Sequence, residues 1–264
     1  MVSTVLDLAG RVALVTGAGQ NVGRQIALHL AAHGAGGVVV NDFFAERAEA
    51  VAAEVVARGG KAIAVQADVT DLAGVKAMVT RATEAFGGVD ILMNNAGNAG
   101  ATPTSGARRP FWETGPADWN SFLGVNLHGP LNCAAACVPG MIERQWGHII
   151  TIISDAGRVG EARLEVYSAA KAGAAGLTRA LARSLARHNI RANNVAIAAM
   201  NTPAIQARHA ADPERAKKGL EKYVVRRLGE PRDVANMVLF LACDASDWIT
   251  GQTYPVNGGF SFTM

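Results

Sequence analysis

The sequence has little of what several protein classes require. Only three of its 264 residues are cysteine, which is too few for a disulfide framework. Charged residues make up 18% of the chain and hydrophobic residues 50%, a balance that excludes an intrinsically disordered protein. No apolar run approaches the roughly 20 residues of a membrane-spanning helix, and no signal-peptide pattern develops before Arg11. We therefore expect a cytoplasmic protein that does not bind membranes.

The charge balance gives no reason to expect a nucleic-acid partner. The net charge is +3, from 25 basic and 22 acidic residues, which is too weak to attract a polyanion by itself. No cysteine and histidine cluster has zinc spacing, so we expect no metal. Cys133 and Cys137 lie four residues apart in an alanine-rich stretch and are predicted to be small, reduced core residues. A small molecule is the expected partner.

Short β-branched runs alternate along the chain with longer segments of helical period. The runs are almost continuously apolar, as strands covered on both faces are. Val22, Ile26 and Leu30 form one helical stripe, and a second extends from Val75 to Phe86. The alternation predicts one α/β domain over residues 1–264, with a doubly wound parallel sheet and helices on both faces. The predicted strands are Val12–Thr16, Val38–Asn41, Ala62–Gln66, Ile91–Met93, His148–Ile153, Ala192–Ile197 and Thr253–Val256.

Two longer segments interrupt the alternation. Asn98–Ala117 contains three prolines and is predicted to be a loop. Pro203–Arg227 is polar and weakly helical. Both follow strand ends, where open α/β sheets bind their ligands. We expect the second segment, residues 203–227, to cover the substrate.

The first predicted strand leads into a glycine-rich turn, Thr16–Gly23, and then into a helix. A helix N-terminus presents free N–H groups and a partial positive charge, so a pyrophosphate fits there. The alternative is a glycine-rich turn without a ligand. The turn lacks the Gly-Lys-Ser/Thr ending of a P-loop, which argues against a P-loop nucleotidase.

Asp42 ends the second predicted strand, 19 residues after Gly23. An acidic residue at about this distance accepts hydrogen bonds from the adenosine ribose and repels a 2′-phosphate. The adjacent Phe43–Ala45 supply no cation for such a phosphate. NAD(H) is therefore predicted over NADP(H), the alternative being that Asp42 only caps the next helix. Asp68 and Asn94–Gly97 also follow strands, although each could equally be turn chemistry.

Tyr167 and Lys171 lie four residues apart, on one face of a predicted helix. An ammonium group, helped by an oxidised nicotinamide, favours the phenolate and so lowers the pKa of the phenol. Ser154 ends the fifth strand and either hydrogen-bonds a substrate oxygen or caps a helix. Asn126 precedes the Gly129-Pro130 break, where it either satisfies backbone groups freed by a kink or holds a water that relays protons.

The order of these segments, from about Arg11 to Gly259, resembles the short-chain dehydrogenase/reductase superfamily, in its 3-oxoacyl-reductase and hydroxysteroid-dehydrogenase branch. The resemblance implies a seven-stranded Rossmann-type domain that interconverts a secondary alcohol and a ketone with NAD(P). It implies that Tyr167 is the general acid/base, Lys171 binds the nicotinamide ribose, Ser154 orients the substrate and Asn126 holds the relay water. A homotetramer is also implied. The implied cofactor contacts are Gly17, Gln20, Asn21, Val22, Asp42, Phe43, Asp68, Val69, Asn95, Ala96, Gly97, Tyr167, Lys171, Met200 and Thr202.

Two positions depart from the family pattern. Asn21 stands where the family has glycine, and Asn best tolerates the positive φ that this turn needs. Ile197-Ala198 stands where the family has Pro-Gly, next to the expected nicotinamide. We expect cofactor binding to persist at both positions.

The sequence leaves the substrate open. Residues 203–227 carry seven basic and three acidic residues, a net +4, and Arg108 and Arg109 lie in the other long segment. Such a cluster of basic residues suits a substrate that carries phosphate groups, such as a hydroxyacyl- or ketoacyl-CoA. The alternative is that it is only a solvated helix face. Alternatively, aromatic residues wall a pocket for a steroid-like or small cyclic alcohol. A non-catalytic NAD(H)-binding sensor or scaffold is a further alternative, against which the complete set of four catalytic residues argues. The candidate wall residues are Phe111, Trp112, Trp119 and Met200.

Overall fold

Seven parallel strands form one sheet in the order β3-β2-β1-β4-β5-β6-β7. The computed structural model describes residues 5–97 and 109–262. The strand order runs outward from β1 in both directions, which places the topological switch point between β1 and β4. The predicted fold class is confirmed, and every predicted strand is present. The strands are β1 (Val12–Val15), β2 (Gly37–Asp42), β3 (Ala62–Gln66), β4 (Ile91–Asn94), β5 (Gly147–Ser154), β6 (Ile190–Ile197) and β7 (Thr253–Val256).

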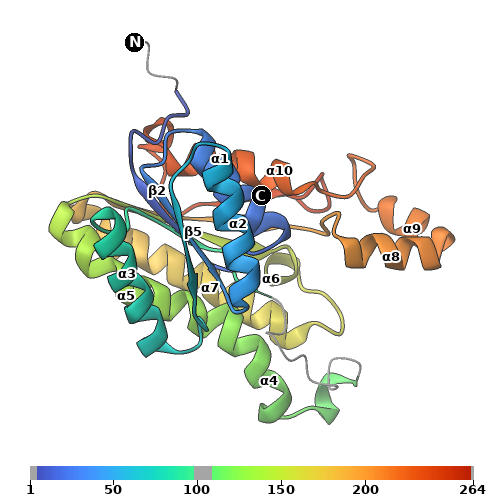
Figure 1. The fold of residues 1–264 in the computed structure, drawn as a ribbon. Helices are drawn as coiled ribbons and strands as arrows, with labels where there is room; N and C mark the ends of the chain where they lie inside the picture. Colours follow the sequence, from blue (N-terminus) through green and yellow to red (C-terminus); the bar gives the residue numbers. More distant parts are fainter. Residues whose placement is uncertain (1–4, 98–108, 263–264) are drawn as a thin grey trace.

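Helices cover both faces of the sheet (Figure 1). One face packs on α1 (Asn21–Ala32), α2 (Ala45–Ala57) and α10 (Pro231–Ala242). The other packs on α3 (Leu72–Phe86), α5 (Gly129–Arg144) and α7 (Glu165–Leu185). Side chains alternate along a strand, so Val38 and Val40 enter the first core while Val39 enters the second. This explains why β1, with the sequence VALV, has no polar position.

The segment predicted as a loop over Asn98–Ala117 ends earlier than predicted. Residues 98–108 lie outside the described part, and a short 3₁₀ turn, η2, spans Phe111–Glu113. Helix α4 then begins at Pro116 and ends at Leu123. Proline suits the first position of a helix because its missing N–H would have no partner there. A proline that was interpreted as a loop signal therefore starts a helix.

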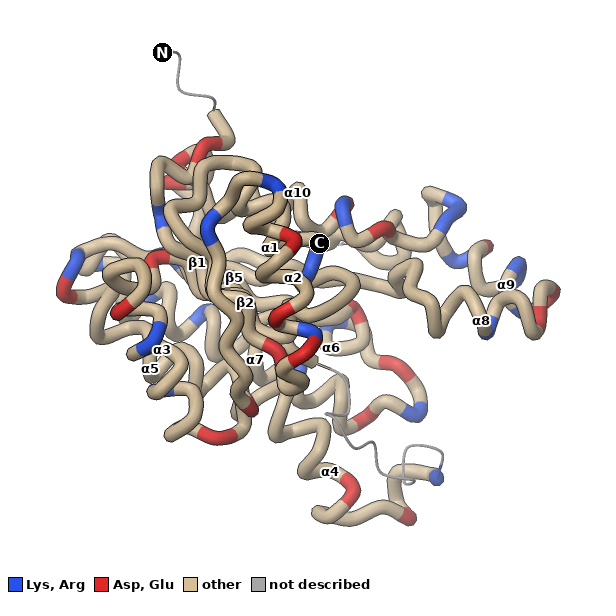
Figure 2. The backbone as a smooth tube through the Cα atoms, in the orientation of Figure 1, with Lys and Arg blue, Asp and Glu red and all other residues tan. Residues whose placement is uncertain are grey.

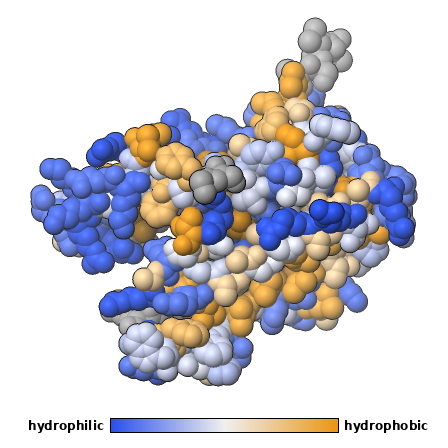
Figure 3. All heavy atoms as spheres, turned by 180° about the vertical axis from the view of Figure 1, so that it is seen from behind, coloured by the Kyte–Doolittle hydropathy of each residue, from blue (hydrophilic) through white to orange (hydrophobic). Residues whose placement is uncertain are grey.

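The segment expected to cover the substrate forms two helices, α8 (Pro203–Ala211) and α9 (Pro213–Leu220). Neither helix has a buried residue. They project from the body of the molecule as an arm that carries many charged residues (Figures 1 and 2). Seen from behind, the arm is hydrophilic, whereas apolar side chains gather across the middle and lower part of the body (Figure 3). In this structure the arm thus stands away from the sheet.

All three cysteines are buried and unpaired. Burial raises the pKa of the Cys133 thiol to about 12 and that of Cys243 to about 11, so both stay protonated at neutral pH. Over residues 5–97 and 109–262, no helix is long and apolar enough to cross a membrane. The same residues contain no group of three or more His, Cys, Asp or Glu side chains suited to a metal ion.

Candidate active site

The glycine turn after β1 packs tightly against the end of β4. Gly17 has a φ of 60°, and a methyl group there would lie 2.9 Å from the Cα of Ala96. A methyl group on Gly23 would lie 2.3 Å from the Gly17 carbonyl oxygen. Only glycine fits either position. Asn21, at the family's glycine position, has a φ of 47°, which confirms that the turn keeps its positive φ there.

The N-terminus of α1 has no capping side chain. Gln20 precedes the helix with extended backbone and an exposed side chain that makes no cap hydrogen bond, and the first turn holds no acidic residue. Val22 instead points into the core. The first backbone N–H groups of α1 are thus available to an anion such as a pyrophosphate.

Asn95 and Thr16 fasten this turn to the sheet. The Asn95 side-chain amide donates hydrogen bonds to the carbonyls of Thr16 and Gly17, at 2.9 and 3.0 Å. The Thr16 hydroxyl accepts hydrogen bonds from the backbone N–H groups of Asn95 and Ala96. These contacts hold the ends of β1 and β4 at the switch point.

Asp42 connects the end of β2 to the glycine turn. Its carboxylate accepts hydrogen bonds from the backbone N–H of Gly19 at 3.0 Å and of Phe44 at 3.1 Å, and it is only 6% exposed. Asp42 therefore makes a turn contact just before α2 and does not cap that helix, whose N-cap residue Phe44 has no side-chain cap; it also lies beside the glycine turn.

Phe43–Ala45 carry no cation, but Arg47 in the first turn of α2 does. Its guanidinium lies 4.3 Å from the ring centre of Phe44, and its Cβ would be 2.5 Å from a methyl group on Gly19. The sequence prediction missed this cation because Arg47 lies two residues beyond Phe43–Ala45, the only residues considered there.

Asp68 and Val69 follow β3. The Asp68 carboxylate accepts hydrogen bonds from the backbone N–H and the hydroxyl of Thr70, which is the turn chemistry considered for this residue. Val69 is buried, and its carbonyl accepts a hydrogen bond from the Asn132 side chain on α5 at 2.9 Å. The edge of the predicted adenine site is thus held by α5.

The structure brings the four predicted catalytic residues to the carboxyl ends of β4 and β5. Ser154 ends β5, and Tyr167 and Lys171 lie in α7. A methyl group on Gly97, at the end of the predicted cofactor loop, would lie 3.2 Å from Asn126 Oδ1 and 3.4 Å from Lys171 Nζ. Residues from three separate segments therefore meet at one point.

Asn126 lies in a single π-helical turn, η3 (Gly124–His128), between α4 and α5. Its side chain is fully buried, and its amide donates a hydrogen bond to the Phe122 carbonyl at 2.9 Å. A π turn widens the backbone and frees carbonyl groups. The Asn126 amide thus has a backbone carbonyl as its partner, as one of the two interpretations of this residue expects, and the π turn comes immediately before Gly129.

Burial dominates the electrostatics of Tyr167 and Lys171. It raises the pKa of the Tyr167 phenol; a hydrogen bond with Ser154 lowers that pKa, and the charge of Glu161 raises it. Burial lowers the pKa of Lys171 to about 8. Lys171 Nζ donates a hydrogen bond to the Ile152 carbonyl at 2.9 Å and lies 5.8 Å from the Tyr167 ring centre. In the protein alone, desolvation thus outweighs the lowering of the phenol pKa that the sequence predicts from Lys171.

Met200 and Thr202 follow β6. Met200 is buried and pairs with Gly229 in an isolated parallel bridge. The Thr202 hydroxyl caps α8 through the backbone N–H of Ile205. At the position where the family has Pro-Gly, the register of β5 and β6 sets Ile197 opposite Ser154, so this departure lies beside a predicted catalytic residue.

A small pocket opens beside Tyr167. Phe111 and Trp119 stack with ring centres 5.7 Å apart, and Phe122 meets Tyr167 edge to face at 6.3 Å. Trp112, an expected wall residue, is 82% exposed, and neither it nor Met200 lines this pocket. The segment directly before Tyr167 was missed, because its residues carry no recognisable pattern. The lining residues are Arg109, Phe111, Thr114, Asp118, Trp119, Phe122, Arg163, Leu164, Glu165, Val166 and Tyr167.

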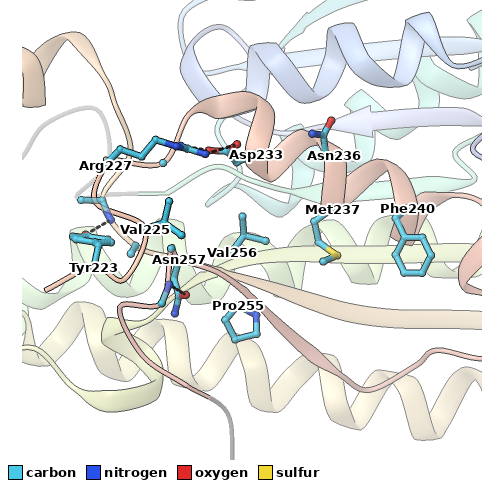
Figure 4. A pocket seen from close by; sticks show the side chains of 15 residues that line it. Tyr223, Val225, Arg227, Asp233, Asn236, Met237, Phe240, Pro255, Val256 and Asn257 are labelled. Atoms are coloured by element: carbon cyan, nitrogen blue, oxygen red, sulfur yellow. Dashed lines mark hydrogen bonds and ion pairs between the residues drawn. The ribbon is translucent and has the colours of Figure 1, made fainter. Parts of the chain in front are cut away.

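A larger cavity of about 590 Å³ lies between α10 and the edge strand β7 (Figure 4). Met237 and Phe240 face it from α10, and Pro255 and Val256 from β7. The ion pair of Arg227 and Asp233 lies at one side. None of the four predicted catalytic residues lines this cavity.

The fold and this grouping define a nucleotide-binding oxidoreductase of the Rossmann type. Residues 17–261 match a family model described as enoyl-(acyl carrier protein) reductase. The chain is 41% identical over 257 residues to the (2S)-[(R)-hydroxy(phenyl)methyl]succinyl-CoA dehydrogenase subunit BbsD of Thauera aromatica, covering 97% of this chain and 98% of that one. It is 38% identical over 250 residues to the 3-oxoacyl-[acyl-carrier-protein] reductase FabG of Staphylococcus aureus, covering 94% and 96%.

The chain is also similar to a solved structure. That structure is a 7α-hydroxysteroid dehydrogenase in complex with NADH and 7-oxo glycochenodeoxycholic acid. The TM-score is 0.88 at 36% identity, over 96% of this chain and 95% of the other. The chain belongs to the short-chain dehydrogenase/reductase superfamily, in the branch of 3-oxoacyl reductases and hydroxysteroid dehydrogenases.

Proposed function

We propose that this protein is an NAD-dependent dehydrogenase that interconverts a secondary alcohol and a ketone. The observation that carries the proposal is the meeting of Asn126 and Lys171 at Gly97, with Ser154 hydrogen-bonded to Tyr167. The glycine turn and the uncapped N-terminus of α1 fit a dinucleotide, because their free space and N–H groups match a pyrophosphate. A bound nicotinamide supplies hydride transfer.

Residues of the protein orient the substrate oxygen and transfer its proton. The Ser154 hydroxyl donates a hydrogen bond to the substrate oxygen and orients it. Tyr167 removes the proton from an alcohol or returns it to a ketone. Lys171 stabilises the phenolate and holds the nicotinamide ribose, and Asn126 holds a water that relays the proton. The buried surroundings of Tyr167 strengthen each of these interactions.

For the cofactor we propose NAD(H) over NADP(H). The Asp42 carboxylate, already in contact with Gly19, lies where a ribose 2′-phosphate would be repelled. Arg47 is the opposing consideration, because its Cβ and the Asp42 carboxylate lie next to the same side of Gly19. Its stacking on Phe44 engages its guanidinium, so we expect Asp42 to decide the preference.

For the substrate we propose a hydroxyacyl- or ketoacyl-CoA. One relative is named as a dehydrogenase of a succinyl-CoA derivative, and the α8–α9 arm supplies a cationic surface. Arg227 is paired with Asp233, so the other basic residues of the segment 203–227 are the candidates for the CoA phosphates. They are Arg208, Arg215, Lys217, Lys218, Lys222 and Arg226.

The second candidate substrate is a ring-shaped alcohol. The stacked Phe111 and Trp119 beside Tyr167 favour it, as does the similarity to a hydroxysteroid dehydrogenase. A screen that follows reduced nicotinamide by absorbance, with hydroxyacyl-CoAs, steroids and cyclic alcohols in the presence of NAD⁺ or NADP⁺, separates the candidates. Binding of NADH without turnover of any substrate would instead indicate a sensor or scaffold.

We also propose a cytoplasmic homotetramer. The apolar cavity at the open edge strand β7 supports self-association, because Met237 and Phe240 are there only partly covered (Figure 4). Light scattering coupled to gel filtration tests the assembly, and a monomeric mass would contradict it.

A further inference from the structure

Asp155, the residue after Ser154, is the centre of a buried polar cluster. Its backbone N–H donates a hydrogen bond to the Ile197 carbonyl at 3.0 Å, and the residue is only 1% exposed. A carboxylate in such a place needs partners, because an unpaired buried charge is costly. The partners come from the other end of the chain as well as from its own turn.

Each carboxylate oxygen of Asp155 has its own donor. Oδ1 accepts a hydrogen bond from Arg158 Nη1 at 2.6 Å, in α6 (Ala156–Val159). Oδ2 accepts one from Asn257 Nδ2, also at 2.6 Å, just after β7. With both oxygens engaged, the carboxylate cannot turn without losing a partner.

Arg158 extends the cluster to the C-terminal segment. Its Nη1 also donates to the Ser261 hydroxyl at 2.9 Å, and its Nη2 donates to the Phe262 carbonyl at 3.3 Å. Asn257 donates to the Ser261 carbonyl at 2.9 Å. The turn that follows Ser154 is therefore held against the segment Asn257–Phe262.

This turn also sets the position of the Ser154 hydroxyl. Its oxygen accepts a hydrogen bond from the backbone N–H of Ala156 at 3.2 Å, and Ser154 is hydrogen-bonded to the Tyr167 phenol. A shift of Asp155 or Ala156 therefore moves the hydroxyl relative to the phenol. Displacements of about 1 Å from productive geometry cost up to hundredfold in rate.

We propose that Arg158 is a positioning residue, which fixes the Ser154 hydroxyl against Tyr167 by clamping Asp155 to the C-terminal segment. The proposal rests on the proposed function for its kinetic consequences, but not for the geometry that it asserts. The central variant is Arg158→Met, which removes the guanidinium and keeps most of the side-chain bulk. Arg158→Lys keeps the positive charge and is expected to change the protein less than Arg158→Met does.

Arg144→Met is the matched control. Arg144 also joins an aspartate, Asp90, at 3.0 Å and a carbonyl, that of Val89, at 2.6 Å, but it lies before the first residue of β5, whereas Ser154 is the last residue of that eight-residue strand. Both variants lose an ion pair and a carbonyl contact. Thermal unfolding of each reports the structural cost, which can be similar for the two.

The decisive readout is the pKa of the Tyr167 phenol, measured by NMR with ¹³Cζ-labelled tyrosine. The chain has three tyrosines, so Tyr167→Phe assigns the signal. Because the Ser154 hydrogen bond lowers this pKa, we expect Arg158→Met to raise it, as Ser154→Ala does, while Arg144→Met leaves it unchanged. In turnover, Arg158→Met is expected to lower kcat by about tenfold or more without raising the KM for NAD⁺.

An unchanged Tyr167 pKa in Arg158→Met, with a raised one in Ser154→Ala, would overturn the proposal. So would an equal rise in Arg144→Met, because the effect would then be a general loss of stability. The titration needs no substrate and no turnover. A wild-type protein that shows these shifts but oxidises no alcohol would contradict the proposed function and leave this inference standing.

Discussion

The carboxylate of Asp42 accepts a hydrogen bond from the backbone N–H of Gly19 at 3.0 Å, so the end of β2 is joined directly to the glycine turn. This contact places a negative charge beside the expected adenosine ribose. We expect Asp42→Ala to reduce the ratio of kcat/KM for NADH over NADPH by about tenfold, since the repulsion of a 2′-phosphate is lost.

Arg47→Met provides the control for that variant. It removes the neighbouring cation and is expected to weaken NADPH further while NADH changes little. A wild-type preference for NADPH would contradict the argument from Asp42.

Variants of Asn21 test whether the turn tolerates asparagine in place of the family's glycine. With a φ of 47°, it occupies a backbone region in which glycine has no strain and Asn has little. We expect Asn21→Gly to bind NADH as tightly as wild type, and Asn21→Val to lose about 1–2 kcal/mol of unfolding free energy. NADH titration by fluorescence and urea unfolding measure the two. Loss of NADH binding in Asn21→Gly would show that the Asn side chain itself contacts the cofactor.

The pH profile follows from the groups around Tyr167. Alcohol oxidation needs the phenolate, so its kcat falls as the pH drops below the apparent pKa of Tyr167. Ketone reduction needs the phenol, so its kcat falls as the pH rises above that pKa. Glu161 raises this pKa, and Lys171 Nζ lies 5.8 Å from the centre of the phenol ring. We expect Glu161→Gln to lower the apparent pKa and move both limbs to lower pH, by less than about one unit because the site of Glu161 is exposed.

Glu165→Gln is the matched control, since Glu165 is exposed on the same segment and does not act on the pKa of Tyr167. Profiles of kcat against pH, in both directions, measure the shift. If the pH profile of Glu161→Gln matches that of wild type, or if Glu165→Gln shifts it equally, the charge of Glu161 does not set the pKa of Tyr167 as we propose.

Stability at mild acid is expected to depend on His148, at the opposite edge of the sheet. His148 is 2% exposed, and burial, followed by the charges of Arg191 and Arg11, lowers its pKa well below its usual value. The unfolded chain therefore binds a proton near pH 6.5 that the folded protein does not bind until lower pH. Unfolding free energy is thus lost as the pH falls below about 6.5, by up to about 1.4 kcal/mol per pH unit.

Urea unfolding between pH 7.5 and pH 5 is expected to show this slope in wild type and a smaller slope in His148→Gln. His209→Gln, on the projecting helix α8, is expected to keep the wild-type slope. The same slope in all three proteins would be inconsistent with a proton that His148 excludes on folding.

The sequence predicted the architecture well because periodicity is a local signal. The β-branched runs found all seven strands to within about two residues, and the order of the glycine turn, Ser154 and Tyr167 located the carboxyl edge of the sheet. Prediction from local sequence was wrong where one residue type is typical of two structures, as proline is of loops and of the first position of a helix. Pro116 was interpreted as part of a loop, and it begins α4.

The parts that the sequence did not predict depend on contacts between distant segments. Asp155 and Asn257 are 102 positions apart, and nothing in either neighbourhood indicates that they meet. Arg47 lies beside Gly19 only because α2 packs against the glycine turn. The phenol pKa was expected to fall under the influence of Lys171, but the burial that raises it can be seen only in the folded chain.

The central claim is that Tyr167 exchanges the proton with the substrate oxygen, and Tyr167→Phe tests it most directly. The substitution removes one hydroxyl and keeps the ring that packs against Phe122. With the best substrate of the screen and NAD⁺, we expect kcat to fall by at least about a hundredfold while the Kd for NADH stays within about threefold of wild type. Turnover by Tyr167→Phe at the wild-type rate would contradict the account.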